Sequence, residues 1–319
     1  MPGRRRKNRP LQGVFDAMKQ QDFASIEEAN AWLQDAMASY NLEAQADLGG
    51  LSPRQMAQLL ADDWSGRGVV QVARDLTWSE VRGSAWLQGA RALLESTREQ
   101  GPIRLTGDLD VDDAAILVRS RAMTDAAQGL GLLGGDFMTG ELDPEDVFFS
   151  EVLELLIYAG LIRMKGDTLA PTRRGIALVS EARAGELYAI LLRAFVAEMS
   201  LMELHEIPEQ LGAIEAFKGF TAYRLLHDAR PWRGAAWLAD RVAHPELWSS
   251  PELVGLPRDL RAGLMVLLVL GPMVQLGLLE MTTRKGRREP SFRCAPLFSR
   301  ALNFDFSRAV DVDPDPRRN

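Results

Sequence analysis

The sequence predicts a mainly α-helical fold whose β-structure is limited to short strands and small hairpins. Apolar residues recur at helical spacing through most of the chain. Strand-like runs are short, and they are paired around a turn at two places, one near the middle of the chain and one near its end. We therefore expect a helical N-terminal region followed by two related modules, each of which ends in a hairpin.

The composition is that of an ordinary globular protein. The 319 residues are 46% hydrophobic and 25% charged, which is sufficient for two or three domains with their own cores. The single cysteine, Cys294, excludes an internal disulfide and a thiolate-rich zinc site. The apolar run 264–270 is too short to span a bilayer, and the basic segment Met1–Pro10 is not followed by the apolar stretch of a signal peptide. We expect a cytoplasmic protein with no membrane partner.

The first 70 residues predict a basic arm and a small helical region. Met1–Gln12 carries five cations and no acid, and we expect it to be disordered. A short helix is expected at 15–20. Ser25 and Glu28 form a capping box, which predicts a second helix that ends near Asn41.

The next segment predicts a module with a defined order of elements. A capping box opens a long helix over 77–100, and a short strand follows at 103–106. Asp110 is expected to cap a second helix, and a third covers 144–159. Two β runs around Gly166-Asp167 then form a hairpin. This order of helix, strand, two helices and hairpin is that of a winged-helix domain, in which the hairpin is the wing.

A weaker second copy follows. Helices are expected at 220–229, 232–242 and 257–270, with strands at 276–283 and 291–298. Gly160 matches Gly277 at an offset of 117, and Ala170-Pro171 matches Ala295-Pro296 at an offset of 125. The difference predicts an eight-residue insertion in the second wing, where extra residues cost little. The expected organisation is a basic disordered arm (1–12), a small helical region (13–70), winged-helix-like module 1 (71–200), winged-helix-like module 2 (201–306) and a disordered tail (307–319).

Several short motifs carry a family resemblance: Leu51-Ser-Pro-Arg-Gln-Met56, Leu105-Thr-Gly-Asp-Leu109, the first hairpin, Gly277-Leu-Leu-Glu280 and Ala295-Pro-Leu-Phe298. From about residue 45 the chain resembles an uncharacterised bacterial protein family with tandem winged-helix-like modules. Members of that family sometimes carry a plasmid-type or SEC-C metal-binding domain. The chain lacks the cysteines of a SEC-C segment, so the resemblance implies the fold and no metal function.

Several segments resemble catalytic or cofactor-binding motifs, but each lacks a residue or a neighbouring element that the motif requires. The glycines of 129–134 match a dinucleotide fingerprint in letters, but no strand precedes them. The acids of 108–113 lack the glycine and the bidentate glutamate of a calcium loop. His205 is not followed by a second metal-ligating histidine, and His227 and His244 have no companion in the sequence. We expect no enzymatic activity, no cofactor, no metal and no small-molecule substrate.

The distribution of charge favours an unusual mode of nucleic-acid binding. The third helix of module 1 carries only acids, and the equivalent segment 264–270 of module 2 is apolar on every side and should be buried. Neither is suited to reading bases. The basic residues lie instead in the arm and in the two wings: Arg4, Arg5, Arg6, Lys7, Arg9, Arg163, Lys165, Arg173, Arg174, Arg284, Lys285, Arg287, Arg288 and Arg293.

Two functions remain open. The first is a regulatory binding protein in which the arm and wings contact the backbone of a nucleic acid with little sequence reading. The second is a protein-interaction or scaffold module that binds no nucleic acid. Seven tryptophans could serve as interface anchors, but their helical spacing favours a place in the core for each.

Overall fold

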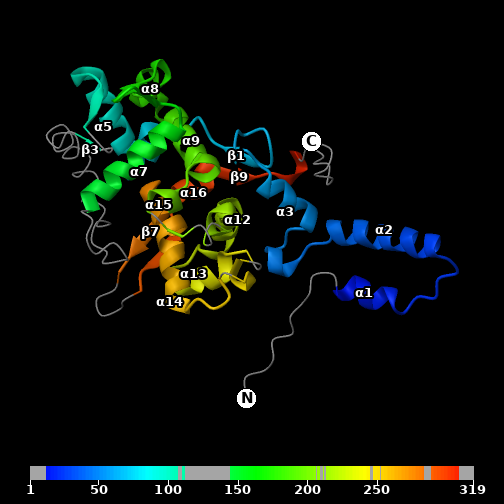
Figure 1. Ribbon diagram of the computed structural model, residues 1–319. Helices are drawn as coiled ribbons and strands as arrows, with labels where there is room; N and C mark the ends of the chain where they lie inside the picture. The colour runs from blue at the N-terminus through cyan, green and yellow to red at the C-terminus, as the bar shows by residue number, and fades with distance from the viewer. Residues whose placement is uncertain are drawn as a thin grey trace. The chain divides into compact units, whose positions relative to one another are not determined.

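The computed structural model describes residues 12–106, 110–111, 144–205, 207–208, 211, 213–244, 247–251, 253–283 and 289–308. The fold is mainly helical, with small antiparallel sheets (Figure 1). The chain divides into two compact units, 1–59 and 60–319. The predicted basic arm up to residue 11, the glycine-rich hexapeptide and most of the predicted tail lie outside the described residues.

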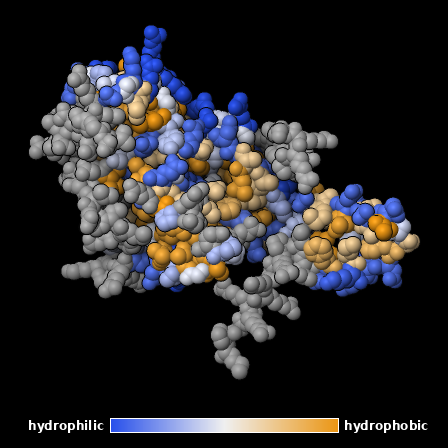
Figure 2. Space-filling model, viewed as in Figure 1, coloured by the Kyte–Doolittle hydropathy of each residue, from blue (hydrophilic) through white to orange (hydrophobic). Residues whose placement is uncertain are grey.

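Unit 1 consists of α1 (Gln12–Met18), α2 (Ile26–Leu42), the 3₁₀ turn η1 (Ala46–Leu48) and most of α3 (Pro53–Leu60). Ser25 caps α2 as predicted, because its hydroxyl accepts the Glu28 N–H at 3.1 Å, while the Glu28 carboxylate accepts the Ala24 N–H at 2.7 Å. Phe23 and Trp32 pack their rings 5.9 Å apart. No residue of α2 is buried, and hydrophobic residues cover much of the visible face of α1 and α2 (Figure 2).

Unit 2 begins with a strand that the sequence did not reveal. β1 (Val70–Val72) pairs antiparallel with β9 (Leu302–Phe304), so the first and last strands of the unit are neighbours (Figure 1). The Asp62 carboxylate accepts the N–H groups of Trp64 and Val70 at 2.7 and 2.9 Å and fixes the turn before β1. The short 3₁₀ turn η7 (Phe306–Arg308) then reaches into the segment predicted as a tail.

The first half of unit 2 contains α4 (Trp78–Val81), α5 (Ala85–Gln100), β2 (Ile103–Thr106), β3 (Asp110–Val111), α7 (Pro144–Tyr158), β4 (Ile162–Lys165), β5 (Thr168–Pro171) and α8 (Arg173–Leu178). The predicted strand at 103–106, the helix from 144 and the hairpin are present, whereas the helix predicted before residue 144 falls mostly outside the described residues. The Thr77–Glu80 capping box is present, but the long helix predicted from it is two helices. Ser84 caps the second by accepting the Leu87 N–H at 3.2 Å. The prediction that Asp110 caps a helix is wrong, because Asp110 lies in β3 and pairs with β2.

The second half contains the 3₁₀ turn η2 (Glu181–Arg183), α9 (Ala184–Arg193), the π-helical turn η3 (Ala194–Glu198), α10 (Leu201–Leu204), α11 (Ala213–Ala216), α12 (Lys218–Asp228), β6 (Arg233–Gly234), α13 (Ala235–Val242), the 3₁₀ turn η5 (Leu247–Ser249), α14 (Arg258–Met265), the π-helical turn η6 (Val266–Leu270), α15 (Gly271–Gln275), β7 (Leu279–Thr282), β8 (Ser291–Cys294) and α16 (Pro296–Ala301).

Three strands of the four-stranded sheet β3-β2-β5-β4 are connected in the same way as the strands of the three-stranded sheet. The strand order β2-β5-β4 in the first is matched by β6-β8-β7 in the second, and every pairing is antiparallel. The helix before each hairpin ends in the same cap. Gly160 and Gly277 have φ of 65° and 76°, and in each case the following N–H bonds back to a carbonyl five residues earlier.

The strand register corrects the predicted insertion. Ile162 and Leu279 begin the first strand of each hairpin at an offset of 117, and their partners Pro171 and Cys294 differ by 123. The second turn is therefore longer by six residues and not by eight. The two Ala-Pro dipeptides are not structurally equivalent, so their offset gave the wrong insertion length. Ala170-Pro171 ends β5, whereas Ala295-Pro296 begins α16.

The core of unit 2 runs through both halves. The fully buried rings of Trp86 and Phe195 meet edge to face at 5.5 Å. The buried Tyr188 hydroxyl on α9 donates to the Leu276 carbonyl at 2.9 Å, which joins α9 to the end of α15. The expectation that every tryptophan is core holds for Trp64 and Trp86 alone. The others are partly exposed, and four of these stack against an arginine: Trp78, Trp232, Trp237 and Trp248.

Candidate nucleic-acid interface

The β4–β5 hairpin is anchored at its base by one threonine. Thr172 ends the hairpin and caps α8: its hydroxyl accepts the Gly175 N–H at 3.1 Å and lies 3.1 Å from the Gly160 carbonyl, to which it can donate. A Cβ at Gly175 would lie 2.4 Å from the Leu161 carbonyl oxygen, so only glycine fits there. The Thr-x-x-Gly pattern therefore holds α8 tightly against the start of the hairpin.

Four cations project from this anchored segment. Residues alternate across a strand, so Arg163 and Lys165 lie on the face of β4 opposite to the buried Ile162. Arg173 and Arg174 occupy the first turn of α8. All four side chains are exposed, and hydrophilic residues dominate the surface around α8 (Figure 2). The hairpin and α8 thus bring together the four predicted contact residues of module 1.

In the part of the chain that the structure describes, these four cations do not stabilise the fold through ion pairs or side-chain hydrogen bonds. Within the described residues, none of the four forms an ion pair or a side-chain hydrogen bond. Arg173 and Arg174 also stand at a helix N-terminus, where the macrodipole disfavours positive charge by about 0.3–1 kcal/mol. Other arginines of unit 2 are neutralised by a carboxylate: Arg91, Arg183, Arg193, Arg224, Arg258 and Arg300. The β4–β5–α8 segment is therefore a surface with uncompensated positive charge.

The second hairpin is different where it is described. Arg293 on β8 pairs with Glu280 on β7, at 2.6 Å between Nε and Oε2, and its guanidinium lies 4.8 Å from the centre of the Trp232 ring. Its charge is compensated, so Arg293 is a weak candidate for phosphate contact. The remaining cations predicted in this turn, and those of the arm, lie outside the described residues: Arg284, Lys285, Arg287, Arg288, Arg4, Arg5, Arg6, Lys7 and Arg9.

The two segments predicted as third helices, α7 and 264–270, both contribute to the core. On α7 Glu151 is only 8% exposed and accepts the Trp86 indole N–H at 3.3 Å. Its other oxygen lies 3.3 Å from His205 Nε2, without the alignment of a hydrogen bond. Burial and the nearby Glu203 raise the pKa of Glu154 above its usual value. The segment 264–270 is largely buried, as predicted.

The sequence did not reveal a cavity that adjoins the interface. Arg174 lines it together with Arg74 and Arg193, which come from a loop and a helix distant in the sequence. No local pattern links these three residues, because only the tertiary fold brings them together. No group of three or more His, Cys, Asp or Glu side chains that could hold a metal ion occurs within the described ranges. Nor, in the same ranges, is any helix both long enough and apolar enough to cross a membrane.

Comparison of the chain with protein-family models, curated proteins and solved structures finds no match.

Proposed function

We propose that the two modules are diverged winged-helix-like domains and that the first wing, with α8, contacts the phosphate backbone of a nucleic acid. The observation that carries this proposal is the set of four exposed, uncompensated cations Arg163, Lys165, Arg173 and Arg174. Met164 is also exposed, at 58%, but strand alternation places it on the face of β4 opposite to Arg163 and Lys165, so it is not part of this set. The protein would act as a non-enzymatic regulator that binds with little sequence discrimination.

The electrostatics determine the expected behaviour. Each phosphate neutralised by a cation releases counterions, so the affinity for duplex DNA falls with salt with a slope of about −0.9 per contact in log K against log salt. Four contacts from the wing and α8 give a slope of roughly −3 to −4, and contacts from the arm would make it steeper. α7 carries acids and no cation, and the segment 264–270 is largely buried, so neither adds base reading and affinities for unrelated sequences of equal length should be similar.

A charge-matched pair of variants tests the proposal. Arg163→Gln/Arg173→Gln removes two uncompensated cations, whereas Arg258→Gln/Arg300→Gln removes two exposed cations that are already ion-paired. Binding to a labelled duplex is measured by fluorescence anisotropy between about 50 and 200 mM salt, the range over which such contacts weaken strongly. The first variant should lose about two from the magnitude of the salt slope, and the second almost nothing. Equal loss in both variants, or no binding by the unmodified protein at low salt, refutes the proposal.

A self-associating scaffold is the second candidate, favoured by the two-helix hairpin of unit 1. Phe15, Ile26 and Leu42 are 49%, 76% and 64% exposed, and α2 buries no residue. Segment 13–43 contains six acids and one lysine, while the arm Met1–Gln12 contributes five cations, so a second copy offers both apolar surface and opposite charge. Sedimentation of the protein and of Ile26→Glu tests this function. A monomer in both cases would exclude it.

A further inference from the structure

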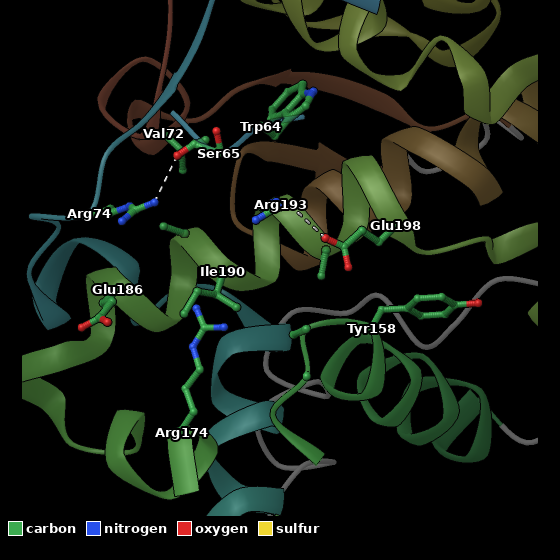
Figure 3. Close-up of a pocket in the computed structure, with 14 residues that line it drawn as sticks. Trp64, Ser65, Val72, Arg74, Tyr158, Arg174, Glu186, Ile190, Arg193 and Glu198 are labelled. Atoms are coloured by element: carbon green, nitrogen blue, oxygen red, sulfur yellow. Dashed lines mark hydrogen bonds and ion pairs between the residues drawn. The ribbon is translucent and has the colours of Figure 1, made fainter. Parts of the chain in front are cut away.

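A cavity of about 310 Å³ lies in unit 2 beside the base of the first hairpin (Figure 3). Its walls come from β1 and the segments on either side of it, from the end of α7, from α8, from α9 and from η3. The volume is at the lower end of the range for small-molecule sites. Ile190 gives the cavity an apolar patch, and Arg174 extends from α8 toward it (Figure 3).

Three guanidinium groups line this cavity, and two of them are held in place. Arg74 donates from Nη2 to the Ser65 carbonyl at 3.1 Å, and Arg193 donates from Nε to the Asp63 carbonyl at 3.1 Å. A guanidinium has five N–H donors in a planar fork, so both retain donors for a ligand. Arg174 makes no ion pair or side-chain hydrogen bond within the described part of the chain.

The acids of the cavity do not cancel this charge. Glu186 is bound by Arg183, with Nη2 2.8 and 2.7 Å from its two oxygens, and Arg183 is not a lining residue. Glu198 pairs with Arg193 at 3.4 Å. After these pairings the charges of Arg74 and Arg174 remain uncompensated. Both groups therefore have charge and N–H donors with which to form charge-assisted hydrogen bonds to an anion in the cavity.

We propose that this cavity binds a small phosphorylated molecule, with its phosphomonoester between Arg74 and Arg174 and its organic part against Ile190. Planar guanidinium forks suit tetrahedral phosphate oxygens, and the apolar patch suits a sugar or a base. Binding at this site does not depend on nucleic-acid contact. One consequence rests on the proposed function: Arg174 belongs to both sites, so the small molecule and the nucleic acid should compete for it.

Calorimetric titration with AMP, ribose 5-phosphate, inorganic phosphate and citrate tests the proposal on the full chain. Saturable binding of a phosphomonoester is expected, with citrate weaker. Arg174→Gln and Arg74→Gln should each weaken it roughly ten- to a hundredfold, since each removes a hydrogen bond to a charged group. Arg173→Gln, in the same helical turn but outside the cavity, should leave the titration unchanged and weaken only nucleic-acid binding.

The outcomes separate the two proposals. If none of the four probes binds, if citrate binds as tightly as the phosphomonoesters, or if Arg173→Gln weakens the titration as much as Arg174→Gln, the phosphate site is refuted. Loss of nucleic-acid binding in the Arg163→Gln/Arg173→Gln variant with an intact AMP titration would support both sites as distinct. An intact titration in a protein that ignores nucleic acid would refute the interface alone.

Discussion

Replacing Glu215 by glutamine should destabilise the protein far more than the loss of one surface charge would. Lys218 is 2% exposed, and its ammonium lies 3.1 Å from Glu215 Oε1. The ammonium also donates to the carbonyls of Phe195 and Met199 at 3.2 and 2.8 Å. Removing one partner of a buried pair leaves an uncompensated charge and costs about 3–5 kcal/mol. Glutamine keeps the shape and one acceptor oxygen for the Leu201 N–H, and its amide can donate to the Ser200 hydroxyl that Oε2 contacts at 2.9 Å, so the main loss in Glu215→Gln is the charge.

The pH dependence of the free energy of unfolding provides a second, independent test of the Lys218–Glu215 pair. Burial lowers the pKa of Lys218 below its usual 10.5, and Glu215 opposes that shift. Between the folded pKa and 10.5 the unfolded chain binds more protons, so the free energy of unfolding rises with pH in that window. In Glu215→Gln the pKa of Lys218 should fall further, and the rise should begin at a lower pH.

Urea unfolding followed by circular dichroism at several alkaline pH values measures both effects. The control is Glu198→Gln, which breaks a partly exposed pair with Arg193 and should cost less than about 1 kcal/mol. A loss in Glu215→Gln no larger than in this control, with an unchanged pH profile, would refute the assignment of a buried, charged Lys218.

Three further substitutions test the packing of unit 2 by the same unfolding assay. Tyr188→Phe removes the buried hydrogen bond to the Leu276 carbonyl and should cost about 0.5–1.5 kcal/mol; no change would mean that the bond adds nothing to stability. Gly185→Ala places a Cβ 2.3 Å from the Leu76 carbonyl oxygen and should cost at least about 1–3 kcal/mol, whereas unchanged stability would show that the backbone yields easily. Gly160→Ala has free space but a φ of 65°, so about 1–2 kcal/mol should be lost through backbone strain alone.

The sequence correctly predicted those elements that are determined by residues close together in the chain. The caps at Ser25 and Thr77 and the hairpin around Gly166 depend on residues within a few positions of one another, and all are present. The expectation that Asp110 caps a helix failed because an aspartate before apolar residues resembles a helix cap, whereas Asp110 pairs with β2. β1 was missed for the same reason: its partner lies at the other end of unit 2.

The candidate interface was predictable only in part. Charge patterning singled out Arg163, Lys165, Arg173 and Arg174, but it gave Arg293 equal weight. Whether a cation is compensated depends on which acid the fold places beside it, and cross-strand Glu280 could be identified only once the register was known. The wall of the cavity formed by the loop before α4 was invisible for a similar reason, since contacts between distant segments leave no periodic trace in the sequence.

The pairing of β1 with β9 constrains how this protein can be made. During synthesis β1 leaves the ribosome more than two hundred residues before its partner strand. At about 5–20 residues per second, Val70, which is fully buried in the finished fold, waits roughly 10–50 s with an open strand edge. A nascent chain at this stage exposes a strand that can pair with a neighbouring chain, and polysomes translating this message would hold many such edges close together. Synthesis of β9, more than two hundred residues after β1, is thus the event that protects β1.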